Sequence, residues 1–259
     1  MAFGLERIDW DQPWFAGWRE LGLLAYGHVS ERASNFASLN SLQVARASDT
    51  LTLGSGRAVE FVSQSELPND IAYEAYISLH KRVPTRDNLH DFFNALCWLR
   101  FPQTKLRLNF LQAQYIASEG VGATRGPLRD ALTLFDENVL LLQTSDDLWH
   151  ALQVRDWGKL FFGELRDEWR NAHIVIFGHA LLEKLVTPYK SITAHVFRVS
   201  SDVDAQDDQA LDDWLSNNLQ PDYLATKPFV ALPVLGIPSW CPENEDLSFY
   251  LDTQVFRTA

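Results

Sequence analysis

The sequence contains little cysteine, which excludes several classes of protein. Only two of its 259 residues are cysteines, Cys97 and Cys241, and neither belongs to a CxxC pair. A disulfide-stabilised scaffold needs more cysteines, and structural zinc sites take their thiolates in closely spaced pairs. Both classes are therefore excluded. Cys97 lies inside an apolar helical pattern and is expected to be a buried small side chain.

Long apolar runs and several catalytic signatures are also lacking. No stretch approaches the roughly 18 apolar residues of a membrane-spanning helix, and residues 1–10 do not form a basic segment followed by an apolar one. The sequence therefore predicts a cytoplasmic protein that does not bind a membrane. It contains no GxxxxGK[ST], GxSxG or HExxH motif and no protein-kinase signature, which excludes the enzyme classes that those motifs define.

What the chain does contain is ample material for a packed core. Hydrophobic residues make up 46% of it, including nine tryptophans, and charged residues 22%. No repeat or long linker divides the sequence, so a single domain is expected over residues 1–259. Helical and strand patterns are mixed without a regular alternation, which predicts an α+β fold: a helix-rich domain with a small mixed β-sheet.

The expected elements follow from apolar spacing and from turn residues. Helices are predicted at 10–18, 89–99, 102–116, 147–170 and 179–187, and strands at 58–62, 72–78, 132–135, 139–142, 174–177 and 194–199. The strands at 132–135 and 139–142 are expected to form a hairpin around a polar tip. The proline-rich segment 232–238 is expected to run irregularly over the surface.

Charge is distributed unevenly along the chain. The net charge of −12 opposes non-specific binding to nucleic acid or to an anionic membrane. Residues 81–130, however, carry eight basic and four acidic side chains, and this basic segment suits an anionic small molecule, a phosphoester or a partner protein. Residues 202–213 contain six aspartates, which are expected to form the solvated face of a surface helix.

The first candidate site surrounds His90. On a helix, His90 and Asn94 share a face, and Asp91 lies beside them. A histidine next to a carboxylate can bind a divalent metal ion or act as a general base, while Arg86 and Asn94 could contact a substrate. The His-Asp doublet resembles that of metal-dependent phosphohydrolases, although the strands expected here conflict with that all-helical fold. Alternatively, Asp87 caps the helix and His90 is an exposed residue of its first turn.

Two further sites are candidates. His179 follows an apolar strand and a glycine, and Glu183 lies four residues later on the same helix face, a spacing that suits two metal ligands or a base and its orienting carboxylate. Alternatively, His179 is a buried histidine bonded to the backbone. In the third site Arg125 and Arg129 suit a phosphate or carboxylate, and Asp130 and Asp136 are either metal ligands or pairing and turn residues.

Several stretches resemble an uncharacterised proteobacterial family, domain of unknown function 3025 (DUF3025). They are VPTRDNLHDFFNAL (83–96), RDALTLFDE (129–137), FGHALLEK (177–184), LGIP (235–238) and PENE (242–245). The resemblance spans about residues 5–257 and implies a single cytoplasmic bacterial domain. It implies no activity, cofactor or catalytic residue.

Together these features predict a metal-assisted hydrolase of a phosphate-containing substrate, such as a nucleotide or a nucleic-acid end. In this hypothesis His90, Asp91 and His179 are catalytic, and Arg86, Asn94, Arg125 and Arg129 bind the substrate. The ligands of a divalent metal cofactor would come from His90, Asp91, Asp130, His179 and Glu183. One alternative is a non-catalytic module that binds an anionic ligand or a partner protein through the basic segment. Another is a buried structural network of the His and Asp residues.

Overall fold

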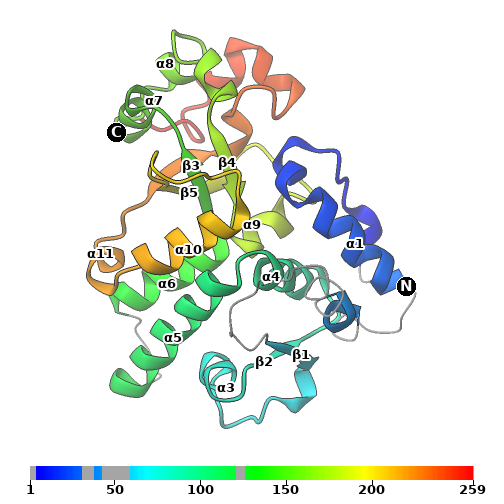
Figure 1. Cartoon of the computed structure of the whole chain (residues 1–259). Coiled ribbons are helices and arrows are strands. Elements are labelled where there is room, and N and C mark those ends of the chain that lie inside the picture. Colours follow the sequence, from blue (N-terminus) through cyan, green and yellow to red (C-terminus); the bar gives the residue numbers. More distant parts are fainter. Residues whose placement is uncertain (1–3, 31–37, 43–58, 121–125, 259) are drawn as a thin grey trace.

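The computed structural model describes residues 4–30, 38–42, 59–120 and 126–258 (Figure 1). Its helices are α1 (Arg19–Ser30), α3 (Tyr73–His80), α4 (Leu89–Arg100), α5 (Pro102–Glu119), α6 (Pro127–Asn138), α7 (Asp146–Gln153), α8 (Trp157–Phe161), α9 (His179–Lys184), α10 (Asp208–Asn218) and α11 (Pro221–Ala225). Short 3-10 helices lie at η1 (Leu5–Arg7), η2 (Pro13–Trp18), η3 (Gln64–Glu66), η4 (Asp167–Arg170), η5 (Val234–Gly236), η6 (Pro242–Glu245) and η7 (Leu247–Leu251). The strands are β1 (Glu60–Ser63), β2 (Arg82–Thr85), β3 (Val139–Gln143), β4 (His173–Ile176), β5 (Thr193–Arg198) and β6 (Val230–Pro233).

The main sheet has four strands in the order β4-β3-β5-β6. Strand β3 is parallel to β5 and antiparallel to β4, and β6 is antiparallel to β5. The predicted α+β fold with a small mixed sheet is therefore confirmed. A second, parallel sheet pairs β1 with β2 and lies with α3 at the bottom of Figure 1, below α4, with α3 beside α5.

The core is apolar and rich in aromatic rings. Residues Val139 to Leu142 of the central strand β3 are all buried, because helices and neighbouring strands cover both faces. Phe135 lies at the centre of a ring cluster, with centroids 5.2 Å from Phe177 and 5.3 Å from Phe197. Cys97 is completely buried, as expected. No helix in the described ranges combines the length and apolar character needed to cross a bilayer.

Two short apolar runs that we expected to be strands are helices. Residues 73–80 form α3, with Tyr76 and Ile77 buried, so the apparent alternation at 72–78 was the wrong period. The hairpin predicted at 132–142 is also wrong. Pro127 starts α6 at its first position, and the helix continues to Asn138 before the chain enters β3 directly. The supposed polar tip of the hairpin is therefore the last turn of a helix.

Two other expectations were wrong, one on the length of a helix and one on the burial of a proline-rich segment. The long helix predicted at 147–170 ends at Gln153, where Arg155 takes a left-handed conformation (φ 55°) and Asp156 caps the next helix. The segment 232–238 is buried rather than superficial, because its first part completes edge strand β6. Pro233 is tolerated there, since an edge strand needs hydrogen bonds on one side only.

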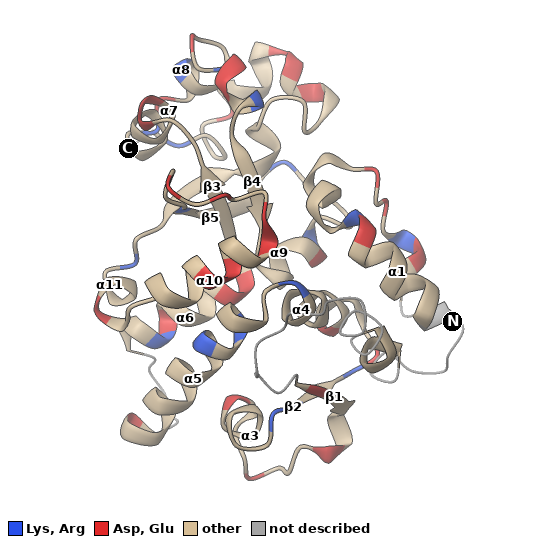
Figure 2. Ribbon diagram, viewed as in Figure 1, with Lys and Arg blue, Asp and Glu red and all other residues tan. Residues whose placement is uncertain are grey.

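Acidic residues are spread widely over the ribbon, with several on α10 (Figure 2). Asp207 caps α10, as the aspartate cluster predicted, but the expectation of a wholly solvated face is wrong. Asp212 is fully buried and accepts hydrogen bonds from the backbone N–H groups of Gln103 and Thr104, each at 2.8 Å. One aspartate of the cluster therefore caps the neighbouring helix α5.

Candidate functional site

The first turn of α4 is held by a cap and an ion pair. Asn88, rather than Asp87, caps the helix, since its Oδ1 accepts the N–H of Asp91 at 2.7 Å. The carboxylate of Asp91 is almost fully buried and accepts three hydrogen bonds from Arg86: from the backbone N (2.6 Å), Nε (3.0 Å) and Nη2 (2.9 Å). Asp91 therefore fixes Arg86 and has both oxygens engaged.

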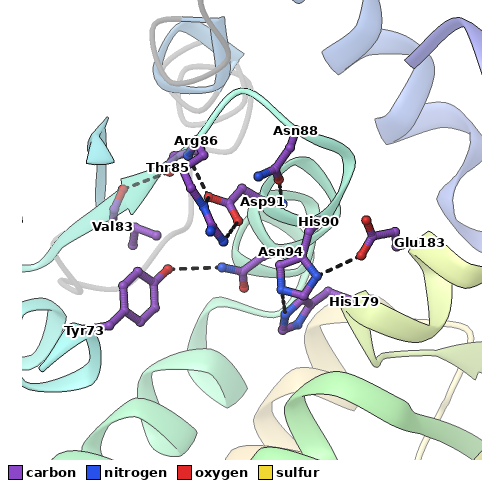
Figure 3. A network of polar contacts seen from close by, with 10 residues as sticks. All are labelled: Tyr73, Val83, Thr85, Arg86, Asn88, His90, Asp91, Asn94, His179 and Glu183. Atoms are coloured by element: carbon purple, nitrogen blue, oxygen red, sulfur yellow. Dashed lines mark hydrogen bonds and ion pairs between the residues drawn. The ribbon is translucent and has the colours of Figure 1, made fainter. Parts of the chain in front are cut away.

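His90 and His179 face each other although they lie 89 residues apart in the sequence (Figure 3). Their Nε2 atoms are 3.1 Å apart, and the two rings meet edge to face with centroids 4.6 Å apart. The Nδ1 atom of His90 lies 2.9 Å from Oε2 of Glu183. Glu183 thus contacts the histidine of the other helix, whereas the i, i+4 spacing had suggested a partner for His179.

A close approach of two chain segments positions His179. Gly178 lies between β4 and α9, and a Cβ atom there would overlap the backbone of Glu137 and Asn138 at the end of α6. Glycine is therefore needed, because it lets α9 begin directly beside α6. As a result His179, the first residue of α9, is 5% exposed, and its Nδ1 lies 3.8 Å from Oδ2 of Asp136.

Below the histidines lies a buried chain of polar side chains. The Nζ of Lys105 on α5 forms an ion pair with Asp136 of α6 and donates to Oδ1 of Asn94 at 2.8 Å. The Nδ2 of Asn94 in turn donates to the hydroxyl of Tyr73 at 3.2 Å. Burial would raise the pKa of Asp136, but Lys105 and the nearby His179 outweigh burial and hold that pKa below its usual value. Burial and the charges of Asp91 and Asp136 raise the pKa of Tyr73.

The protonation of the histidine pair follows from these contacts. A carboxylate only accepts, so Nδ1–H of His90 donates to Glu183, and Nε2 of His90 is left as an acceptor for Nε2–H of His179. Burial lowers the pKa of His179 to about 4, which keeps it neutral near pH 7. Its Nδ1 then carries a lone pair, and 3.8 Å from Asp136 is too long for a hydrogen bond. The pair forms a directional chain from His179 through His90 to Glu183.

These side chains line a cavity of about 340 Å³. Its walls come from η3, α3, α4, α5, α6 and α9 and are mostly polar: Gln64, Leu67, Tyr73, Glu74, Arg86, His90, Asp91, Asn94, Gln112, Arg129, Thr133, Asp136, Glu137 and His179. Arg129 makes no ion pair or hydrogen bond within the described ranges and contributes a free guanidinium to the wall. A ligand in this cavity would meet both cationic and anionic groups.

Most, but not all, of the predicted site residues meet here. Six of them line the cavity: His90, Asp91, His179, Arg86, Asn94 and Arg129. Glu183 contacts His90. Asp130 is not a wall residue, since it faces Lys227 at 3.4 Å on the outer side of α6. Arg125 lies outside the described residues.

The remaining basic side chains of segment 81–130 are largely engaged elsewhere. Arg82 pairs with Glu60 and Glu66, and Arg100 pairs with Asp208. Arg107 donates to a backbone carbonyl of Leu219 at 3.3 Å. The basic segment of the sequence is therefore not a continuous cationic surface, and Arg86 and Arg129 are its members at the cavity.

The sequence analysis did not select two residues that build this site, Tyr73 and Lys105. Tyr73 was assigned to a strand, and Lys105 was counted only as part of the basic segment. Asp136 was a candidate metal ligand but was placed at a hairpin tip. The spacing of Lys105 along the helix could have indicated that it is buried, because Lys105 shares a face of α5 with the buried residues Leu108 and Asn109. A lysine at such a position needs a buried anion.

The predicted metal site is not confirmed by the geometry. Two nitrogens 3.1 Å apart are compatible with two ligands of a zinc-like ion at roughly 2.0–2.1 Å each. However, the described residues contain no group of three or more His, Cys, Asp or Glu side chains arranged to hold a metal ion. Binding would also require the proton of His179 to move to Nδ1, opposite Asp136.

The fold and this site define an α+β protein with a histidine pair, one member buried and one partly exposed, at the wall of a polar cavity between helices. Residues 59–259 match the family described as Protein of unknown function (DUF3025). The chain belongs to that family. No curated protein and no solved structure is similar enough to match.

Proposed function

We propose that this protein is a hydrolase of phosphate-containing substrates, such as a nucleotide or a nucleic-acid end. The observation that supports this most directly is the chain of hydrogen bonds from His179 through His90 to Glu183 at the wall of a polar cavity. A histidine whose second nitrogen donates to a carboxylate is a favourable general base, since the carboxylate stabilises the imidazolium that forms.

The two histidines would have different roles. His90 is about one-third exposed. A bound substrate would separate the two rings, and Nε2 of His90, released from Nε2–H of His179, would take the proton of an attacking water. His179 stays neutral because burial lowers its pKa to about 4, so it would donate Nε2–H to a phosphoryl oxygen without adding a charge. Water would attack phosphorus, the bond to the leaving oxygen would break, and the proton on His90 would pass to that oxygen.

Two arginines support a phosphate as the substrate group. Arg86 is held in place by Asp91, and Arg129, in the same wall, has no partner among the residues that the structure describes. Guanidinium groups bind phosphate oxygens through paired hydrogen bonds. The carboxylates of Asp136 and Glu137, on the same helix as Arg129, also line the cavity and suit the hydroxyl or amino groups of a nucleoside.

The proposal keeps a divalent metal ion as an alternative to the proton between the two histidines. His90 and His179 would be its protein ligands, and water and phosphate oxygens would take the other coordination positions. We also propose a cytoplasmic location, which is consistent with two cysteines that are both free in the structure.

A hydrolysis assay with defined variants tests the proposal. The purified protein is treated with EDTA and assayed on p-nitrophenyl phosphate, bis-p-nitrophenyl phosphate, nucleotides and short oligonucleotides, with and without added Zn²⁺, Mn²⁺ or Mg²⁺. We expect His90→Ala to lower the rate by about 100-fold or more, the usual contribution of a general base. Its free energy of unfolding should fall by no more than ~1 kcal/mol, because a partly exposed residue of a first turn contributes little to the core.

His150→Ala is the matched control, since His150 is an exposed histidine on α7 away from the cavity. It should leave the rate unchanged. Activity without metal supports a mechanism in which a proton lies between His90 and His179. Activity that returns only with metal supports a mechanism in which the two histidines hold a metal ion. If no substrate is hydrolysed, or if His90→Ala is as active as the wild type, the hydrolase assignment is wrong and phosphate binding through Arg86 and Arg129 is the remaining hypothesis.

A further inference from the structure

A second cavity lies beside the outer edge of β4, at the other end of α4. It has a volume of about 350 Å³, and four tryptophans line it together with Arg100 and strand β4: Trp14, Trp18, Trp169 and Trp240. Arg100 and His90 are ten residues apart on α4, which corresponds to about 15 Å along the helix. The cavity is therefore separate from the histidine pair.

Three buried polar atoms of its wall residues lack hydrogen-bond partners within the described ranges. They are Nε1 of Trp14, Nη1 of Arg100 and Nε2 of His173. Buried polar side-chain atoms nearly always have a partner, so three exceptions around one cavity require an explanation. These atoms are covered in the free protein, so a ligand that accepts hydrogen bonds would reach them through a small movement of the wall side chains.

Arg100 is the charged group of this wall and is held rigidly. Its side chain is 7% exposed, and Nε and Nη2 donate to Asp208 at 2.7–3.0 Å. Its guanidinium carbon lies 4.8 Å from the ring centroid of Trp18. A Cβ atom at Gly17 would come within 3.0 Å of Nη1, so glycine leaves room for the guanidinium. Two of its three nitrogens are thus engaged, and Nη1 remains as a donor.

The free edge of β4 adds backbone donors to the same wall. The N–H of Phe177 bonds to the carbonyl of Val139 in β3 at 3.0 Å, and antiparallel pairing alternates from there. The backbone groups of Ile174 and Ile176 therefore point away from β3, and the carbonyl of Ile176 indeed accepts from Nε1 of Trp18 at 2.9 Å. The N–H groups of both isoleucines have no partner strand, because β4 is at the edge of the sheet.

We propose that this cavity binds a small aromatic carboxylate, with its ring among the tryptophans and its carboxylate toward Arg100. The unpartnered N–H groups of Trp14, Arg100 and the β4 edge match a carboxylate, and the flat aromatic faces match a ring. The volume is at the lower end of the range of ligand sites, about 300–1,000 Å³, and holds a molecule of one or two rings. This proposal does not depend on the hydrolase function.

Titration calorimetry with two acids and their amides tests this inference. The probes are indole-3-acetate and 3-phenylpropionate, compared with indole-3-acetamide and 3-phenylpropanamide, which keep the ring and lose the charge. We expect the acids to bind and the amides to bind at least about tenfold more weakly, since hydrogen bonds to a charged partner are the stronger ones. If neither acid binds, the proposal is wrong.

Three variants locate the binding. Trp14→Phe keeps an aromatic ring and removes only the unpartnered N–H, so the Kd of the acids should rise about fivefold. Ala172→Phe fills the cavity and should abolish binding. Trp149→Phe, on α7 outside the cavity, and His90→Ala should leave the Kd unchanged. Acids that bind equally well to Trp14→Phe and Ala172→Phe would place the binding elsewhere and overturn the proposal; circular dichroism checks that each variant is folded.

Discussion

The two ends of helix α4 border two cavities whose buried polar groups are paired to different extents. At its N-terminal end, the histidine cavity surrounds charges that pair with one another, Lys105 with Asp136 and Arg86 with Asp91, and Nδ1 of His179 alone among its buried side-chain atoms lacks a partner within the described ranges. At its C-terminal end, the tryptophan cavity surrounds donors such as Nη1 of Arg100 that have no partner within the described ranges. The comparison shows that one helix can support a preassembled polar network and a site that an external acceptor would complete.

This difference has an energetic consequence. In the histidine cavity, removing one partner leaves the other buried without compensation, and such losses are among the most costly substitutions. In the tryptophan cavity, removing an unpartnered donor takes away no hydrogen bond of the free protein. Substitutions of the ion-paired residues at the histidine cavity should therefore destabilise the protein. Substitutions of the unpartnered donors at the tryptophan cavity should change ligand affinity instead.

The largest effect is expected when the buried ion pair of the histidine cavity is broken. Asp136→Ala leaves the ammonium group of Lys105, whose side chain is 4% exposed, without its anion. Loss of one member of a buried pair costs about 3–5 kcal/mol, so the free energy of unfolding in urea should fall by about that amount.

Asp130→Ala is the control for this variant, since Asp130 lies on the same helix in a half-exposed pair with Lys227. Exposed pairs contribute little, and the change should stay below about 0.5 kcal/mol. Equal losses in the two variants would mean that the network around Lys105 is no more important than a surface pair, and the contrast between the two cavities would disappear.

An intermediate effect is expected from the pH dependence of stability. The pKa of His179 is about 4 in the folded protein and about 6.5 when unfolded, so the unfolded chain binds more protons between these values. The stability that neutral His179 permits is complete above pH 6.5 and falls as the pH decreases toward 4. Between pH 7 and pH 5 the loss should be about 1–2 kcal/mol, and His179→Gln should remove it.

His173 provides the corresponding test in the tryptophan cavity. Burial and the charge of Arg100 also lower its pKa, but His173 is only partly buried, so water compensates more of the effect. His173→Gln should therefore reduce the slope of stability against pH less than His179→Gln does. Urea unfolding of both variants at pH 5, 6 and 7 measures the difference, and a larger change for His173 would contradict the ranking.

The sequence predicted the histidines of the site better than the network that supports them. Helix starts near His90 and His179 were recognisable from the residues that precede them, and both histidines were selected as site residues. Their partners were not predictable in the same way, because the contact between His90 and Glu183 depends on how α4 packs against α9, far along the chain. Local patterns carry information on spacing within an element, not on which elements meet.

An error in element type explains why Asp136 was placed wrongly. Asp136 was placed at the tip of a hairpin because Asp, Glu and Asn follow one another there, yet in the structure they end α6. The signal that could have corrected this is the spacing of Leu128, Ala131, Leu132 and Phe135, which fits a helical period. A short apolar run fits both periods, and the burial pattern that decides between them exists only in the folded chain.

The smallest effect on stability is expected at Arg129, which belongs to the histidine cavity but resembles the other region in having guanidinium donors without a partner within the described ranges. Arg129→Gln removes no ion pair within the described residues, so the free energy of unfolding should change by less than about 0.5 kcal/mol. Arg86→Gln, by contrast, takes two hydrogen bonds from the buried carboxylate of Asp91 and should cost about 1.5–3 kcal/mol. In the phosphoester assay both variants should raise KM. If Arg129→Gln is destabilising and leaves KM unchanged, Arg129 is a structural residue. The described wall of the histidine cavity would then offer a substrate no cationic side chain without a partner.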